Sequence, residues 1–188
     1  MSNKEQNQVI VMDAGLDIGN GYVKGAISVN GEKETGIDFL SGVAIQTSSH
    51  DIKTRANEAQ AVVDDIFNQM EASFDSAAVE NNAHRLFGRR GVSSGKSMEE
   101  FDVSSTISKA SQDLSGILIL GCLAGKALQY VFHKSGSLPT EMVQVEAKIA
   151  LALPITEYKL YRKMYADKFK AATHVVSIYN FEFPVRVE

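Results

Sequence analysis

The stretch LDIGNGYVKG, residues 16–25, joins two segments of β-type residues near the start of the chain. VIVMDAG precedes it and AISV follows it, and Asn-Gly is a strong hairpin signal, so we expect the turn of a β-hairpin here. The same stretch holds an acid, two glycines and a lysine, namely Asp17, Gly19, Gly21 and Lys24. It therefore has two interpretations, a plain hairpin turn and a loop that binds phosphate.

The chemistry of a phosphate loop can be argued from these residue types. Asp17 stands at the end of a predicted buried strand, where a carboxylate needs hydrogen bonds or a cation, and magnesium is the cation we expect. The glycines beside Asn20 allow positive φ and leave backbone N–H groups bare for an anion. Lys24 follows Asp17 by seven residues, so a tight hairpin returns its ammonium to the mouth of the turn. On these residues alone, the plain hairpin is the better interpretation.

The composition is that of an ordinary globular protein and argues against several classes. The 188 residues are 44% hydrophobic and 22% charged, with a net charge of −4 that does not favour a nucleic-acid surface. A single cysteine, Cys122, excludes an internal disulfide. The N-terminus lacks the apolar core of a signal peptide, and the apolar run 114–128 is shorter than a membrane span and reads as a buried helix. We expect a cytoplasmic protein with no membrane contact and no direct nucleic-acid contact.

The order of predicted elements is that of an α/β layered protein. They are strands at 9–18, 21–29 and 34–45, helices at 62–70 and 111–132, a strand at 143–153, a helix with Thr156 as N-cap, and two strands around Asn180. The strand at 143–153 becomes continuously apolar, which predicts that it enters the middle of a sheet. We expect residues 1–45 and 104–188 to form a core subdomain, and 46–103 a smaller, more exposed inserted subdomain.

Other motifs give no further candidate site. GRRGVSSGKS, residues 88–97, is similar to a Walker A loop, but three residues separate Gly91 from Gly95 where that motif needs four. No buried strand is expected to lead into it, so we interpret it as a mobile, partly basic loop. The scattered histidines do not favour a zinc site, and Cys122 is expected in the core. The basic residues near this loop are a candidate surface for an acidic partner, although charge runs usually face solvent: Arg85, Arg89, Arg90 and Lys96.

Two motifs resemble the actin superfamily of ATPases. The pattern D-x-G-[S/T/N]-G-x-x-K after an N-terminal strand resembles the first phosphate loop of that superfamily, and the residues that match it are Asp17, Gly19, Asn20, Gly21 and Lys24. The segment 135–169 is similar to plasmid-segregation actin-like proteins of the ParM/StbA type. Its matching residues are Leu153, Pro154, Thr156, Glu157 and Tyr158. The order of elements agrees with these proteins along nearly the whole chain.

The resemblance implies an α/β fold, the actin-like (ribonuclease H-like) domain I. We expect a three-stranded antiparallel start, a mixed sheet flanked by helices, and a small inserted subdomain. The superfamily's second phosphate loop, adenosine motif and second connecting helix have no counterpart in the sequence. The chain reaches Glu188 just before the position expected for the catalytic glutamate. The resemblance therefore implies one wall of a nucleotide cleft, with domain II outside this chain and no catalytic residue within it.

The resemblance also implies a function for the parent protein, an ATPase that polymerises with bound nucleotide and separates plasmid copies. Asp17 would hold Mg²⁺ through water, the backbone of 19–21 would grip the phosphates of ATP or GTP, and Lys24 would neutralise charge. Expected partners are further copies in a filament and a DNA-binding adaptor protein. Whether this chain is itself an enzyme stays open, because half a cleft binds nucleotide weakly or not at all. Two alternatives remain, a non-catalytic binding or filament-contact module and another superfamily member, such as a sugar kinase or a cell-division protein.

Overall fold

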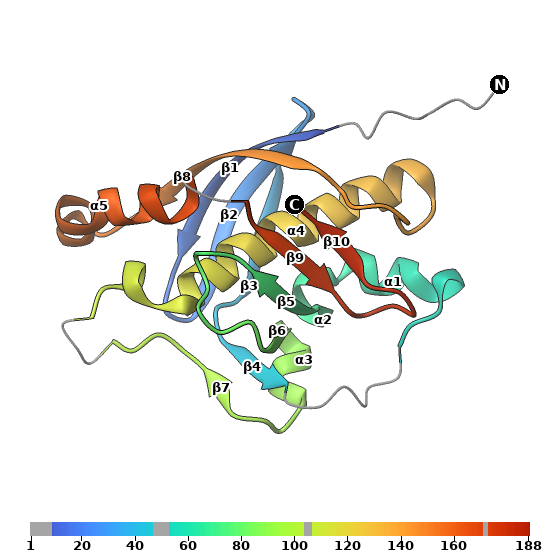
Figure 1. Cartoon of the computed structure of the whole chain (residues 1–188), viewed down its shortest axis with the longest axis horizontal. Helices are drawn as coiled ribbons and strands as arrows, with labels where there is room; N and C mark the ends of the chain where they lie inside the picture. Colours follow the sequence, from blue (N-terminus) through green and yellow to red (C-terminus); the bar gives the residue numbers. More distant parts are fainter. Residues whose placement is uncertain (1–8, 47–52, 104–106, 171–172) are drawn as a thin grey trace.

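Two β-sheets enclose one long helix in this protein (Figure 1). The computed structural model describes residues 9–46, 53–103, 107–170 and 173–188. Within them, one sheet has four strands in the order β3-β2-β1-β8, and the other has six in the order β10-β9-β5-β6-β4-β7. The fold is therefore mixed α/β, as the order of elements in the sequence predicts.

The four-stranded sheet contains the start of the chain. Its strands are β1 (Ile10–Ile18), β2 (Tyr22–Val29), β3 (Thr35–Leu40) and β8 (Val145–Ala152). The β1–β2 and β2–β3 pairs are antiparallel, and β8 runs parallel to β1 on its other side. Burial alternates along β1 because one face of the strand packs on the core. The predicted antiparallel start and mixed sheet are confirmed.

The six-stranded sheet combines the middle of the chain with its C-terminal end. Its strands are β4 (Val43–Gln46), β5 (Glu71–Asp75), β6 (His84–Phe87), β7 (Met98–Glu99), β9 (Val175–Ile178) and β10 (Val185–Val187). β5 pairs with β6 on one side and with β9 on the other. The subdomain boundaries 1–45, 46–103 and 104–188 stay a prediction.

The prediction of one strand over 34–45 is wrong. The segment breaks at Ser41 and Gly42, and its two parts, β3 and β4, belong to different sheets. Ser41 is fully buried, and its hydroxyl donates to the carbonyl of Gly19 at 2.7 Å. This hydrogen bond holds the crossing point against the β1–β2 turn.

The helices cover the sheets and fill the space between them. They are α1 (Ala59–Asp64), α2 (Ile66–Gln69), α3 (Gly88–Ser93), α4 (Asp113–Ser135) and α5 (Ile155–Lys170), with short 3-10 turns at Ala56–Glu58 and Lys109–Ser111. The predicted helix at 62–70 is two short helices that meet at Asp65. α5 begins at Ile155, so Thr156 lies in its first turn and is not its N-cap.

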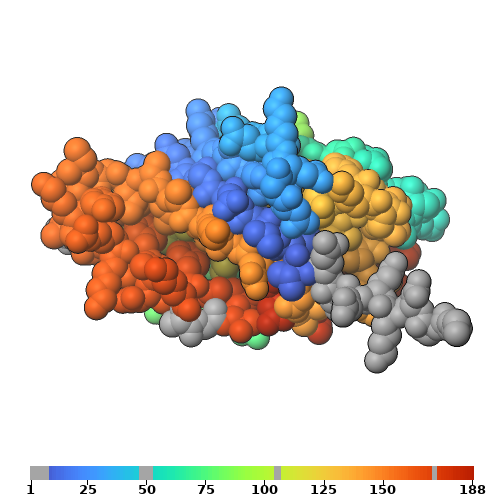
Figure 2. Space-filling model, turned by 90° about the horizontal axis from the view of Figure 1, so that it is seen from above, coloured from blue at the N-terminus to red at the C-terminus, as the bar shows by residue number. Residues whose placement is uncertain are grey.

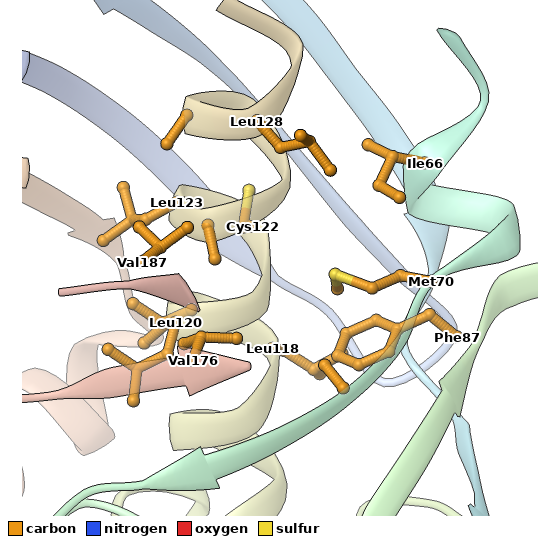
Figure 3. Close-up of a cluster of buried hydrophobic side chains, with 14 of the residues drawn as sticks. Ile66, Met70, Phe87, Leu118, Leu120, Cys122, Leu123, Leu128, Val176 and Val187 are labelled. Carbon is orange, nitrogen blue, oxygen red and sulfur yellow. The ribbon is translucent and has the colours of Figure 1, made fainter. Parts of the chain in front are cut away.

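α4 is the centre of the core. It ends three residues beyond the predicted 132, where Gly136 follows with a φ of 72° and its N–H bonded to the carbonyl of Phe132. By length and composition alone α4 could cross a membrane, but 78% of its most apolar window is buried inside the protein. Figure 3 shows side chains packing on two sides of this helix, with Met70 and Phe87 on one side and Val176 on the other. The expected buried core helix is confirmed.

β8 lies at an edge of its sheet, so the prediction that it enters the middle is wrong for the described residues. Its ladder to β1 is complete, yet most of its side chains remain exposed or half-buried. β10 comes close only to the start of β8, where the Val145 N–H donates to the Glu188 carbonyl at 2.7 Å. Beside the rest of β8 an apolar hollow of about 320 Å³ opens, with α4 as its floor (Figure 2).

Candidate functional site

The turn between β1 and β2 brings the five predicted site residues together at one end of the four-stranded sheet. Asp17 and Lys24 lie directly opposite each other in the β1–β2 ladder. Gly19, Asn20 and Gly21 form the turn between the strands, and the N–H of Gly19 donates to the Tyr22 carbonyl at 2.9 Å. The hairpin interpretation is thus confirmed, and the phosphate-binding interpretation stays a prediction.

Gly19 acts in this turn through its missing side chain and not through positive φ. Among the described residues, positive φ occurs at Asn30 and at four glycines, one of which is Gly31. It does not occur at Gly19 or Gly21. A Cβ on Gly19 would lie 2.7 Å from the carbonyl oxygen of Tyr22, so the tight turn excludes any side chain there. The positive φ that these glycines allow is therefore not used in this loop, and it occurs instead in the Asn30-Gly31 turn.

Ser41 holds the turn so that its amides remain available. Its hydroxyl donates to the Gly19 carbonyl at 2.7 Å, and its N–H donates to the Gly21 carbonyl at 3.0 Å. In the described part of the chain, the N–H groups of Asn20 and Gly21 have no hydrogen-bond partner. Two successive free amides beside an exposed ammonium are suited to an anion such as a phosphate group.

Lys109 is the site residue that the sequence does not reveal. It lies in the 3-10 turn before α4, and its ammonium donates to the Ile18 carbonyl at 2.9 Å while lying 4.9 Å from the ring centroid of Phe101. Burial lowers the pKa of Lys109, and the carboxylates of Glu157 and Asp17 act in the opposite direction. Lys109 stands in a polar stretch without periodicity, so no pattern marks it. It adds a second cation behind the turn.

The same 3-10 turn joins the two motifs that resemble the actin superfamily. Glu157, in the first turn of α5, accepts from the N–H of Lys109 at 3.2 Å and from the hydroxyl of Ser108 at 3.3 Å. LDIGNGYVKG and LPITEY, more than 120 residues apart, therefore meet in space through residues 108 and 109. Glu157 positions Lys109, and Lys109 positions the end of β1.

The residues at the turn fit a phosphate with its magnesium ion. Asp17 is exposed and stands apart, since the described residues hold no group of three or more acidic, histidine or cysteine ligands. A lone carboxylate suits Mg²⁺, which keeps several waters and takes further oxygens from phosphate. Lys24 and the free amides would contact the phosphate itself.

The basic segment 88–97, which is similar to a Walker A loop, is ordered and partly buried, contrary to expectation. The buried strand β6 leads directly into Gly88, which has a φ of 52°, and α3 follows, so the segment is not a mobile loop. Arg85 is 1% exposed and bonded to Glu99 at 2.8 Å, which removes it from any surface for a partner. Arg90 is bonded to the buried Glu71 at 3.0 Å. These arginines stabilise the six-stranded sheet.

Comparison with known proteins finds similarity in structure only. No family model matches the sequence, and no curated protein is similar to it. ParM of Bacillus thuringiensis in its apo form has a TM-score of 0.65 at 15% identity, over 97% of this chain and 44% of that chain. The same protein with ATP has a TM-score of 0.56 at 12% identity, over 97% and 43%. A 15-stranded ParM filament from Clostridium botulinum has 0.55 at 13% identity, over 94% and 44%.

The chain therefore spans less than half the length of the solved structures that it matches. At these identities the likeness concerns the fold, and it agrees with the fold that the two sequence motifs predict. Both sheets and the enclosed helix are part of the structural match, since nearly the whole chain is covered in each comparison. The protein has the actin-like fold, in the form found in ParM-type proteins.

Proposed function

We propose that this chain is the nucleotide-binding domain I of a filament-forming actin-like protein that acts in plasmid segregation in the cytoplasm. The observation that carries the proposal is the β1–β2 turn, where Asp17, Lys24 and two free amides meet in an actin-like fold. The solved ParM structure with ATP supports a nucleotide ligand, and the ParM filament supports self-association. The proposed partners are further copies of the protein and a DNA-binding adaptor protein.

In the proposed role, each residue of the turn binds one part of ATP or GTP with Mg²⁺. The ammonium of Lys24 attracts the phosphates, and the N–H groups of Asn20 and Gly21 donate to their oxygens. Asp17 holds the magnesium ion through water, and the ion offsets the phosphate charge. Lys109 holds the Ile18 carbonyl, so the end of β1 stays in place when the ligand arrives.

We assign no catalytic residue within this chain. The side chains of Asp17, Asn20 and Lys24 are exposed, so the described residues supply one wall of a site and leave the phosphates open to water. Phosphoryl transfer depends on positioning and on electrostatic stabilisation, which one wall cannot complete. This exposure favours the second candidate function at the level of the isolated chain, a non-catalytic binding or filament-contact module.

Titration of the 188-residue chain with MgATP, followed by amide NMR shifts, tests the proposal. Weak, saturable binding is expected, with the largest shifts at residues 17–24. Asp17→Asn and Lys24→Ala should each weaken binding by ~10-fold or more, because each removes a charge-assisted interaction. Asp13→Asn is the matched control, because Asp13 is exposed on the same face of β1 but lies away from the turn.

Equal affinity of the wild type and both turn variants would contradict the proposed site. Parallel titration with MgGTP identifies the preferred base. ATP turnover by the isolated chain would contradict the non-catalytic assignment. Sedimentation with and without nucleotide measures self-association, and a nucleotide-dependent pellet would support the filament-forming role.

A further inference from the structure

A second pocket lies at the end of β2 that is remote from the β1–β2 turn. Its volume is about 320 Å³, and it opens between the β2–β3 hairpin and the C-terminal half of α4. β2 has eight residues, so at about 3.3 Å per residue the pocket lies roughly 20 Å or more from the turn. The buried side chains of Ile27 and Val29 form its apolar floor. Nothing in the nucleotide proposal uses this pocket.

The polar wall of this pocket carries more positive than negative charge. Three lysines, one histidine and one glutamate line it: Lys33, Lys126, Lys134, His133 and Glu32. Glu32, the only acid among them, is bonded to Lys134 at 2.7 Å, and the imidazole of His133 is bonded to Asp64 outside the pocket at 2.7 Å. The pairing leaves Lys33 and Lys126 without an ion-pair partner within the described parts of the chain.

Lys126 is the distinctive member of the pocket. It comes from the middle of α4, is half-buried, and its ammonium has no hydrogen-bond partner among the residues that the structure describes. Burial lowers the pKa of Lys126, with the charge of Glu32 acting in the opposite direction. The Cys122 thiol, one turn away on α4, is buried and does not offset this charge at neutral pH. A half-buried ammonium without a partner gains when an anion enters the pocket.

Tyr130, one turn after Lys126 on α4, lines the pocket, and its oxygen accepts a hydrogen bond from the Asn30 amide at 3.1 Å. Because the oxygen already accepts from Asn30, the hydroxyl hydrogen remains available for an oxygen of a ligand. The ring of Tyr130 lies 5.5 Å from the Lys134 ammonium, which keeps this third lysine at the rim.

We propose that this pocket binds a compact phosphate group, either inorganic phosphate or the phosphate of a small monoester. Lys33 and Lys126 match the charge of a phosphate dianion, and Tyr130 supplies a neutral donor. The volume is at the lower end of the range for small-molecule sites. The apolar floor offers room for the organic part of a monoester. The proposal is independent of nucleotide binding at the β1–β2 turn.

NMR titrations with inorganic phosphate and with phenyl phosphate test this proposal on the full chain. Saturable shifts are expected at Lys126 and Tyr130, and the pKa of Lys126, followed at its Cε, should rise when phosphate is added. Lys126→Gln should weaken binding at least tenfold, while Lys126→Arg retains it. Lys159→Gln is the control, since Lys159 is exposed on α5 and remote from the pocket.

The outcomes separate the two sources of the phosphate group and can overturn the proposal. Tighter binding of phenyl phosphate than of inorganic phosphate assigns the apolar floor to an organic ligand, and the reverse order assigns the site to free phosphate. Equal weakening by Lys126→Gln and Lys159→Gln would show surface attraction only and overturn the site. Acetate binding as tightly as phosphate would overturn the choice of ligand.

Discussion

Replacing Gly25 with alanine places a methyl group inside the β1–β2 ladder. A Cβ at this position would lie 2.1 Å from the carbonyl oxygen of Gly15 and 3.0 Å from Cδ2 of Leu16. Both strands belong to the centre of the four-stranded sheet, where β1 pairs on both sides. The main chain must therefore move by about 1 Å, because contacts under 3.0 Å do not occur for real Cβ atoms.

The expected cost follows from this geometry. Overpacking of a core costs about 1–3 kcal/mol, and a clash with main chain belongs at the upper end because no side chain can rotate away. For a chain of this size, each kcal/mol lowers Tm by about 2–4 °C, so Gly25→Ala should lower it by roughly 6–12 °C. Gly15→Ala is the matched control on the paired strand, because no atom lies within 4 Å of its Cβ. We expect the control to be unchanged or slightly more stable.

Urea and thermal unfolding followed by far-UV circular dichroism measure both variants, since the chain has no tryptophan for fluorescence. The dependence of the unfolding free energy on urea should be the same as in the wild type, which shows that the compactness of the two end states is unchanged. A Tm for Gly25→Ala within about 1 °C of the Gly15→Ala value would refute the reasoning, because it would mean that the ladder absorbs the methyl group without cost.

Three further predictions concern buried and paired side chains. Cys122 is buried and its pKa is raised to about 12, so an aromatic disulfide reagent at pH 8 should label it no faster than the protein unfolds. Hydrogen bonds from Gln60 and His133 lower the pKa of Asp64. The contribution of Asp64 to stability is therefore present above pH 3.8 and is lost as the pH falls through the folded-state pKa. Asp64→Asn should flatten the acid limb of the profile of stability against pH. Glu71 is fully buried and is bonded to Lys53, Arg90 and His84, so Glu71→Gln should lower the unfolding free energy by about 3 kcal/mol in urea titrations, and an unchanged midpoint would contradict this.

Local patterns predicted the elements that local chemistry determines. The position of β1 and the Asn30-Gly31 hairpin turn follow from the residues alone, although β1 alternates in burial where a buried strand was predicted. The same is true of the end of α4 at Gly136. The break between β3 and β4 coincides with the turn-type pair Ser41-Gly42, but the separation of the two strands into different sheets depends on hydrogen bonds from Ser41 to a turn twenty residues earlier. Tertiary contacts of this kind leave no periodic signal.

The candidate site also contains residues that the sequence predicts and one that it does not. Asp17 and Lys24 are predictable as a pair because a hairpin with a known turn brings them opposite each other. Lys109 is not, because its place behind the turn depends on its hydrogen bond to Ile18 and on a carboxylate from α5. Of the two roles predicted for the glycines, Gly19 has the missing side chain and not the positive φ, since a close carbonyl excludes a side chain there.

The open side of β8 has a consequence for the behaviour of this chain in solution. The Val145 N–H points away from β1 to Glu188, so by the two-residue alternation the main chain of Ala147, Ile149 and Leu151 points the same way, and none of it has a partner among the described residues. A strand edge of this kind next to an apolar hollow is a template for association with other chains. The adjacent charge of Lys148 provides only modest protection. Concentrated samples of the isolated chain should therefore associate through this edge.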